Sequence, residues 1–189
     1  MKKSLGPQTM AYPLPAWCIG SYDLEGKPNA ATVAWGGICC SRPPCVTISL
    51  QKIRYTYGNI MERGYYTVNV PSADLVKQVD FFGTASGRDV DKFKESGLTA
   101  VRSDLVDAPY IAEFPFVLEC KVIHTYQIGL HTQFIGEIMD VKVDEDCLGE
   151  DGKPDILKID PIIYSTKTRG YHQVGELIGQ AFEIGRKPR

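Results

Sequence analysis

The sequence predicts a mainly β protein, a closed or partly closed antiparallel barrel with a few short helices. Several strand-like runs follow one another along the 189 residues, and only short helical patterns lie between them. We find no internal repeat, Walker loop or G-x-G-x-x-G motif, so a Rossmann domain is not expected. The length fits one folded domain that covers residues 1–189.

The composition is that of a folded protein outside the membrane. Hydrophobic residues make up 43% and charged residues 23% of the chain, and no run reaches the roughly 18 apolar residues of a membrane span. Gly6 and Pro7 follow the two N-terminal lysines before any apolar signal-peptide region forms. We therefore expect a cytoplasmic protein. A net charge of −2 gives no broad attraction for nucleic acid or a membrane surface, and neither is an expected partner.

The first two predicted strands form a hairpin. Cys18–Asp23 has the pattern of a strand, Leu24–Pro28 that of a turn, and Asn29–Gly37 that of a second strand. Because strand side chains alternate between faces, one face of the second strand carries only Ala30, Thr32, Ala34 and Gly36. A core-filling strand would carry larger residues, so the pattern predicts that something flat and bulky lies against this strand.

The elements up to Gly83 are defined by caps and breakers. They are, in order, a strand at Cys45–Leu50, a helix at Tyr57–Arg63 capped by Thr56 and ended by Gly64, a strand at Tyr65–Val70, and a helix capped by Ser72 that ends before Gly83.

The second half of the chain begins with a polar segment. Residues 84–107 predict a long functional loop that holds one short helix near Val90–Glu95. Two long strands follow at Phe116–Tyr126 and Gln133–Val143. Residues 144–155 resemble an acidic calcium loop but lack its third oxygen ligand, so they predict a solvated hairpin tip.

Two polar stretches are candidates for binding an anion. Lys52, Arg54 and Thr56 alternate onto one side if the extended backbone persists, and the free N–H groups of a helix capped by Thr56 would point to the same place. This arrangement suits a phosphate, although a solvated strand end would look the same. The loop Gly83–Phe93 adds hydroxyls and cations, with an ordinary surface loop as its alternative.

The six cysteines show no C-x-x-C pair, and most are expected to be reduced, buried thiols. Cys39 and Cys40 are the exception, because they border the small-residue strand. A metal or thiol redox sensor built on Cys39, Cys40 and Cys45 is one alternative function. Neighbouring residues of a strand point to opposite faces, which disfavours a shared metal, and we expect no metal site.

Several motifs recur together in the order of one family. They are Pro13-x-Pro15, Gly26–Trp35 (GKPNAATVAW), Arg42-Pro43-Pro44, Thr56-x-x-Asn59-Ile60, Gly83–Gly87 (GTASG), Asp91-Lys92-Phe93, Pro115–Glu119, and Gly129-x-His131 with Ile135-Gly136-Glu137. The sequence thereby resembles the flavin reductase-like branch of the FMN-binding split-barrel proteins over nearly its whole length.

The resemblance implies a six-stranded antiparallel split β-barrel of Greek-key type that forms a homodimer and holds FMN near the subunit interface. The strand at Asn29–Trp35 would lie along the flavin ring, and Lys92 would donate a hydrogen bond to the ring. The cofactor-binding residues that the resemblance implies are Asn29, Ala30, Ala31, Thr32, Val33, Ala34, Trp35, Gln51, Lys52, Arg54, Thr56, Ser86, Gly87, Lys92, Phe93 and His131.

Some assignments stay open on the sequence. Trp35 suits core packing as well as flavin contact, and His131 equally suits a surface hairpin end. The implied activity is that of an FMN-dependent oxidoreductase that takes electrons from NAD(P)H or a small redox protein. The alternative is an electron carrier without an NAD(P)H site of its own. Flavin supplies the redox chemistry, so no catalytic triad is expected.

Overall fold

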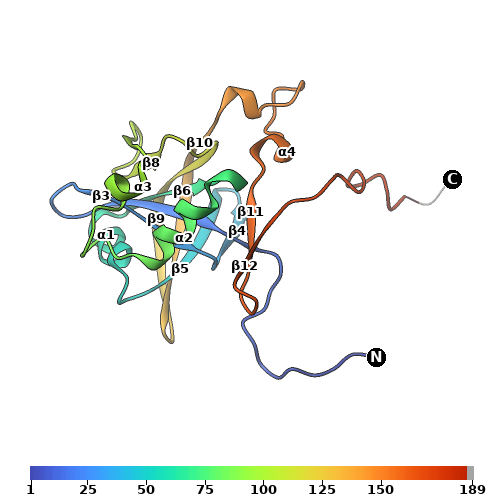
Figure 1. Cartoon of the computed structure of the whole chain (residues 1–189), viewed down its shortest axis with the longest axis horizontal. Coiled ribbons are helices and arrows are strands. Elements are labelled where there is room, and N and C mark those ends of the chain that lie inside the picture. Colours follow the sequence, from blue (N-terminus) through green and yellow to red (C-terminus); the bar gives the residue numbers. More distant parts are fainter. Residues whose placement is uncertain (187–189) are drawn as a thin grey trace.

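The computed structural model describes residues 1–186 and shows a mainly β protein built on one seven-stranded antiparallel sheet (Figure 1). In their order across the sheet, the strands are β3 (Pro28–Val33), β2 (Trp17–Tyr22), β6 (Tyr65–Val70), β9 (Phe116–Ile128), β10 (His131–Val143), β5 (Pro44–Gln51) and β4 (Gly36–Ser41).

The sheet is curled, because strands from its two ends pack in one core. Val33 of β3 and Ile48 of β5 belong to the same buried cluster as Leu118 of β9. The Ser49 N–H also donates a backbone hydrogen bond of 2.9 Å to the Trp35 carbonyl, which joins β5 to the bend that follows β3. The predicted antiparallel barrel is therefore confirmed.

The sheet has seven strands where six were predicted. The predicted strand Asn29–Gly37 breaks at a bend formed by Ala34 and Trp35, which separates β3 from β4. These two strands lie at opposite ends of the sheet, and the bend carries the chain across the place where the barrel closes. The predicted hairpin of β2 and β3 is confirmed, with Ile19 paired to Ala31.

The smaller elements surround this barrel. Two further sheets consist of β1 (Leu14–Pro15) with β11 (Ile162–Ser165) and β12 (Gly170–Gln173), and of β7 (Ala100–Arg102) with β8 (Pro109–Ile111). The α-helices are α1 (Tyr55–Arg63), α2 (Val76–Thr84), α3 (Lys92–Ser96) and α4 (Ile156–Ile159), and two 3₁₀ turns are η1 (Ala73–Leu75) and η2 (Glu145–Cys147).

The short helix predicted near Val90–Glu95 is confirmed as α3. The rest of the segment is not all loop as predicted, because it also contains β7, which pairs with β8 as a short antiparallel ladder. These strands are only three residues long, too short to show a period of two. Ser72 precedes η1 without a side-chain capping bond, and α2 runs on to Thr84.

Helix α2 packs on β3 and thereby shapes the site. Phe82 and Ala30 lie in a second buried cluster, together with Phe114. A Cβ at Gly83 would approach Thr32 Cβ to 3.3 Å, so the last turn of α2 lies almost against the strand. This close approach places the loop after α2 beside the small residues of β3.

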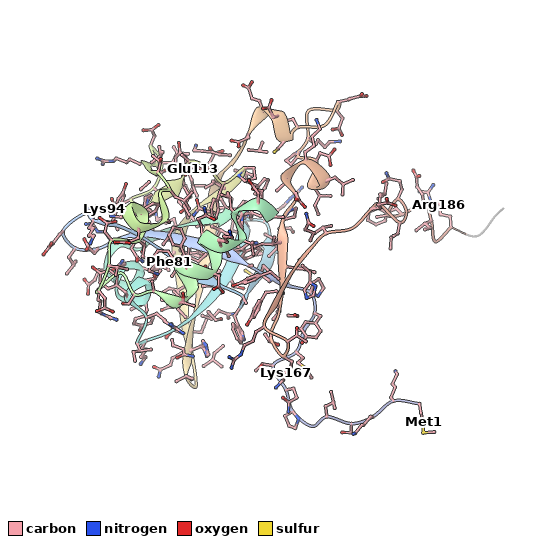
Figure 2. All side chains as sticks on the ribbon, viewed as in Figure 1. Met1, Phe81, Lys94, Glu113, Lys167 and Arg186 are labelled. Atoms are coloured by element: carbon pink, nitrogen blue, oxygen red, sulfur yellow. The ribbon has the colours of Figure 1, made fainter. Side chains whose placement is uncertain are left out.

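Both chain ends leave the body on the side of β11 and β12 (Figure 1). Side chains fill the barrel densely, whereas those near Met1 and Arg186 extend into open space (Figure 2). The C-terminal arm, residues 174–186, carries Leu177, Ile178 and Phe182, which are 67%, 94% and 89% exposed. In the described part of the chain, no helix combines the length and apolar character that a membrane crossing requires.

Candidate functional site

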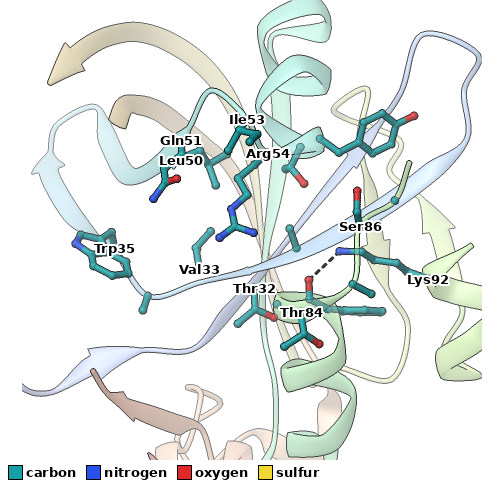
Figure 3. Close-up of a pocket in the computed structure, with 18 of the residues that line it drawn as sticks. Thr32, Val33, Trp35, Leu50, Gln51, Ile53, Arg54, Thr84, Ser86 and Lys92 are labelled. Carbon is teal, nitrogen blue, oxygen red and sulfur yellow. Dashed lines mark hydrogen bonds between the residues drawn. The ribbon is translucent and has the colours of Figure 1, made fainter. Parts of the chain in front are cut away.

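A cavity of about 520 Å³ opens where α1, α2 and β3 meet the end of β5 (Figure 3). Its walls are residues 31–35, 49–51, 53–56 and 82–88, together with Lys92 and His131. Most of the sequence-predicted site residues therefore lie around one cavity. The exceptions are Asn29, Ala30, Lys52 and Phe93, which do not line it.

The N-terminus of α1 forms one end of the cavity. Arg54 is the N-cap residue, with an extended backbone at φ −71° and ψ 139° and no side-chain capping bond. The first N–H groups of a helix have no partner within the helix, and those of Tyr55 and Thr56 belong to residues that line the cavity. The Arg54 guanidinium extends into the same space (Figure 3). Helix amides and a cation together suit an anionic group such as a phosphate.

Two details of the predicted anion site are wrong. The backbone does not stay extended after β5, because the Arg54 N–H donates to the Gln51 carbonyl at 3.0 Å and closes a turn. Lys52 is consequently exposed and outside the cavity, and Ile53 lines it instead. Thr56 is the second residue of α1 rather than its cap, and its hydroxyl accepts a 2.9 Å hydrogen bond from Asn29 Nδ2.

Strand β3 forms the cavity wall with its small side chains. Ala31 lines the cavity, whereas the space beside Ala30 is filled by Val79 and Phe82 of the chain itself. Thr32 also lines the cavity, and its hydroxyl donates to the Val79 carbonyl, which fixes its rotamer. The small residues of this strand therefore let α2 pack closely beside it and leave open space in the cavity.

Lys92 is a buried cation at the base of the cavity. Lys92 is 4% exposed, and its Nζ donates 2.8 Å hydrogen bonds to the carbonyls of Ala30 and Phe82. Figure 3 marks one hydrogen bond of Lys92 with a dashed line. Burial lowers the pKa of Lys92 to about 8. An ammonium group has three donors, so the charged form retains one beyond these two bonds. The neighbouring Phe93 instead packs in the core, 5.7 Å from the Phe82 ring.

The loop after α2 closes the anion end of the cavity. A Cβ at Gly87 would lie 2.2 Å from Asn29 Oδ1 and 2.7 Å from Tyr55 Cδ1, so only glycine fits. Arg88 donates from Nη1 to the Ile53 carbonyl at 2.9 Å, and its guanidinium lies 5.3 Å from the Tyr55 ring centre. These contacts join the loop to the start of α1.

Tyr55 is itself fixed by an acid on the first hairpin. Its hydroxyl donates a 2.7 Å hydrogen bond to Asp23 Oδ2, and this bond raises the pKa of Tyr55 to about 12. The phenol therefore stays protonated at neutral pH. Tyr55 thus provides a rigid support under Arg88 rather than an ionisable group in the cavity.

An aromatic pair borders the other end of the cavity. The rings of Trp35 and His131 are stacked, with centroids 5.8 Å apart and planes inclined by 26°. Trp35 is 44% exposed, so it is not a core residue. His131 reaches this place because it pairs with Gln51 at the end of β10. Trp35 and His131 therefore both line the cavity.

Sequence reasoning missed nine residues that line the cavity. Leu50 had the pattern of a core strand, and Tyr55 stood next to predicted site residues without a motif of its own. The missed set is Ser49, Leu50, Ile53, Tyr55, Phe82, Gly83, Thr84, Ala85 and Arg88. Gly83, Thr84, Ala85 and Arg88 lie within the loop Gly83–Phe93 that the sequence had marked as a candidate, although they were not assigned as site residues. The other five had no signal beyond their position in the sequence.

The cysteines lie outside this cavity. Cys18, Cys45, Cys120 and Cys147 are buried, and Cys39 and Cys40 are exposed. Burial raises the pKa of Cys18 to about 12, so this thiol stays protonated. Within residues 1–186, no three His, Cys, Asp or Glu side chains are grouped so that they could hold a metal ion.

The curled antiparallel barrel and its cavity define a β-barrel protein with a site for a small ligand. The family model for the flavin reductase like domain matches residues 9–175. The chain therefore belongs to the flavin reductase-like family, and the predicted resemblance is confirmed.

Two solved structures and one further relative show how close the likeness is. The flavoredoxin of Desulfovibrio vulgaris (Miyazaki F) is 52% identical, with a TM-score of 0.95 over 98% of this chain and 100% of that chain. The flavoredoxin from Methanosarcina acetivorans is 30% identical, with a TM-score of 0.91 over 98% of both chains. A protein of Archaeoglobus fulgidus is 38% identical over 145 residues, 77% of this chain and 80% of its own.

Proposed function

We propose that the protein binds FMN in the cavity and transfers electrons through it, acting as an oxidoreductase that is reduced by NAD(P)H or by a small redox protein. The observation that carries this proposal is the N-terminus of α1, where uncapped amides and Arg54 meet at one end of a cavity walled by small residues. Flavin reductase-like proteins supply the class of cofactor, and this anion site favours the phosphorylated flavin.

The residues present fit such a ligand along the whole cavity. A phosphate would lie against α1 and Arg54, where the helix amides and the guanidinium both favour negative charge. The flat ring would lie along Ala31 and Val33 toward Trp35, where the wall carries few bulky side chains. Ser86 and Gly87 would enclose the chain between the two ends.

Lys92 would orient the ring. Two of its three donors are used by the carbonyls of Ala30 and Phe82, and the third is available to an acceptor in the cavity. A fixed cation beside the ring favours negative charge there. Bound FMN would supply the redox chemistry, while the chain holds it, excludes water and places this charge.

A carrier without an NAD(P)H site is the second candidate, and the 52% identity to a flavoredoxin supports it. Anaerobic mixing of the FMN-loaded protein with NADH or NADPH in a stopped-flow instrument separates the two. Rapid bleaching of the flavin absorbance supports the reductase. A flavin that both nucleotides leave oxidised, and that dithionite reduces, supports the carrier.

The phosphate site is tested by Arg54→Ala, with Lys52→Ala as the matched control. Both residues are exposed cations two positions apart, but only Arg54 lines the cavity. Arg54→Ala should weaken FMN binding by roughly ten- to a hundredfold, the range for a charge-assisted hydrogen bond. It should leave riboflavin binding unchanged, because riboflavin has no phosphate. Lys52→Ala should change neither affinity.

The measurement is a titration of FMN and of riboflavin into the flavin-free proteins, followed by the quenching of flavin fluorescence. Two outcomes would contradict a phosphate site at Arg54: an equal loss of affinity for FMN and riboflavin in Arg54→Ala, or an effect of Lys52→Ala as large as that of Arg54→Ala. Failure of the parent protein to bind any flavin would remove the proposal itself.

We further propose that residues 1–189 act as one domain in the cytoplasm and that two copies form a homodimer. The exposed apolar side chains of the C-terminal arm support the dimer, because long exposed apolar stretches mark contact surfaces.

A further inference from the structure

Three thiols, those of Cys39, Cys40 and Cys45, lie near the turn of the β4–β5 hairpin. Among residues 1–186, β4 is an edge strand of the large sheet and pairs with β5 alone. The turn at Arg42 and Pro43 joins them, and Cys40 is the direct cross-strand partner of Cys45. Cys39 stands at a bulge in this ladder, between the pairs formed by Ile38 and Cys40.

The bulge brings Cys39 close to the same partner. An extra residue in one strand is left unpaired and locally disrupts the ladder. Cys39 Sγ accordingly donates to the Cys45 carbonyl at 3.5 Å, although the direct partner of Cys45 is Cys40. All three cysteines therefore lie within one small region of the hairpin.

The two cross-strand thiols differ in access. Cys40 is exposed, so a dissolved reagent can reach it, whereas Cys45 is only 2% exposed. Burial and then the adjacent thiols of Cys40 and Cys39 raise the pKa of Cys45. A buried thiol with a raised pKa is poorly placed to attack a reagent in solution, but it can attack a disulfide formed on the cysteine beside it. Cys45 is therefore suited to be the second, resolving cysteine rather than the first to react.

The register of the ladder, which pairs Cys40 directly with Cys45, is compatible with a disulfide. Directly opposed residues of an antiparallel ladder have Cα atoms about 4.5–5.5 Å apart, which lies inside the usual range of about 4.4–6.8 Å for disulfides. Closing a bond between Cys40 and Cys45 therefore needs side-chain rotation rather than movement of a strand.

We propose that Cys40 and Cys45 form a reversible thiol oxidation site that accepts low-molecular-weight disulfides such as oxidised glutathione. The Cys40 thiolate attacks one sulfur of the reagent and expels one thiolate, leaving a mixed disulfide. The Cys45 thiolate then attacks the Cys40 sulfur and expels the second. The two cysteines are oxidised, the reagent is reduced to two thiols, and the two thiol protons pass to solvent or to the departing thiolates.

The site does not depend on the proposed flavin. It would join β4, the edge strand that begins directly after Trp35, to β5 near the turn of the hairpin. Cys18 and Cys120, by contrast, are fully buried in the two cores and are not accessible to such a reagent.

The test counts thiols. The reduced full-length protein is treated with oxidised glutathione, denatured, alkylated with N-ethylmaleimide and weighed intact. The wild-type chain has six cysteines, so it should carry two fewer labels than the reduced control, with no glutathione attached and two hydrogen atoms lost. Fragmentation should place the bond between Cys40 and Cys45, and dithiothreitol should restore all labels.

Single variants identify the partners. Cys39→Ser should still form the bond, Cys40→Ser should lose it, and Cys45→Ser should retain glutathione on Cys40. Cys45→Ala repeats the last test with a residue that adds no buried hydroxyl, and far-ultraviolet circular dichroism checks that each variant is folded. Full labelling of the oxidised wild type, or a bond that persists in Cys40→Ser, would overturn the proposal.

Discussion

At the residue scale, the buried carboxylate of Glu119 in the barrel wall is compensated by an ion pair with Lys142. Glu119 in β9 is fully buried, and its Oε2 lies 3.2 Å from Nζ of Lys142, which is 38% exposed. Asp140 lies on the other side of the same ammonium group, with its Oδ2 at 2.9 Å. A buried carboxylate without its partner is costly, whereas a neutral group of the same shape is tolerated.

Lys142→Met should therefore destabilise the fold by about 3 kcal/mol, because it leaves Glu119 buried and uncompensated. The double variant Glu119→Gln with Lys142→Met should recover most of that loss. Urea unfolding followed by circular dichroism measures both, with Lys121→Met on the exposed part of β9 as the control. A double variant no more stable than Lys142→Met alone would contradict the pairing.

Lys92 makes the stability of the flavin-free protein depend on pH. Its pKa falls from 10.5 to about 8 on folding, so the unfolded chain binds more protons between these values. The contribution of Lys92 to the free energy of unfolding is then fully present above pH 10.5, and it is lost as the pH falls through 8.

Relative to Lys92→Met, the parent should gain on the order of 3 kcal/mol between pH 7.5 and pH 10.5, since each pKa unit corresponds to about 1.4 kcal/mol. Urea midpoints of both proteins across this range provide the measurement. Parallel pH curves would show that the Lys92 amine titrates as it does in the unfolded chain.

The sequence located this site to within a residue or two, and the errors have local causes. The alternation of Lys52 and Arg54 assumed an extended backbone, but the Arg54-to-Gln51 hydrogen bond turns the chain and leaves only Arg54 in the cavity. Phe93 and Lys92 were both predicted to bind the cofactor. At the start of α3, however, Phe93 packs in the core, whereas Lys92 lines the cavity. The turn had no distinct signal, and the Asp91 cap of α3 marks where the helix starts but not which of its first residues faces the cavity.

At the element scale, the loop after α2 is held by packing that excludes any side chain at Gly87. The Cβ of Gly87→Ala would lie 2.2 Å from Asn29 Oδ1, and Asn29 is itself bonded to Thr56 in α1. The loop would have to move away from the start of α1, which is the place we propose for the phosphate.

Gly87→Ala should thus weaken FMN binding at least tenfold while changing the unfolding midpoint of the flavin-free protein little, because the loop is at the surface. Gly58→Ala is the control, since a Cβ there meets nothing within 4 Å. Flavin titration and thermal melts measure the two effects. Unchanged affinity in Gly87→Ala would mean that the loop does not contact the ligand.

Elements with strong local signals were predicted well, and elements defined by pairing were not. Strand β6 was predicted at its observed bounds, and Gly64 ends α1 in the left-handed conformation at φ 73°. The break between β3 and β4 was missed because Ala34 and Trp35 carry no turn residue. What bends the chain there is the closure of the barrel, which only the whole sheet determines.

At the scale of the whole molecule, the C-terminal arm is the main support for a dimer. Leu177, Ile178, Phe182 and Ile184 are each at least 67% exposed. A chain that ends at Gln173 retains every strand of the structure but loses these side chains.

The shortened chain should therefore fold and be monomeric, while the full chain is dimeric, as measured by analytical ultracentrifugation with circular dichroism as the check on folding. Removal of residues 1–6 is the control for loss of a terminal segment. A shortened chain that sediments as a dimer would place the contact on the barrel instead.

The order of the strands also determines when a growing polypeptide becomes able to hold its ligand. A nascent chain that has emerged to residue 115 already contains every residue of the cavity wall except His131. At that length β2, β3 and β6 form one ladder and β4 and β5 another, and no strand yet joins them. Only β9 and β10, made later, bridge the two ladders. Ligand capture during translation would therefore begin abruptly once β10 leaves the ribosome, and a truncated product that lacks it would stay empty.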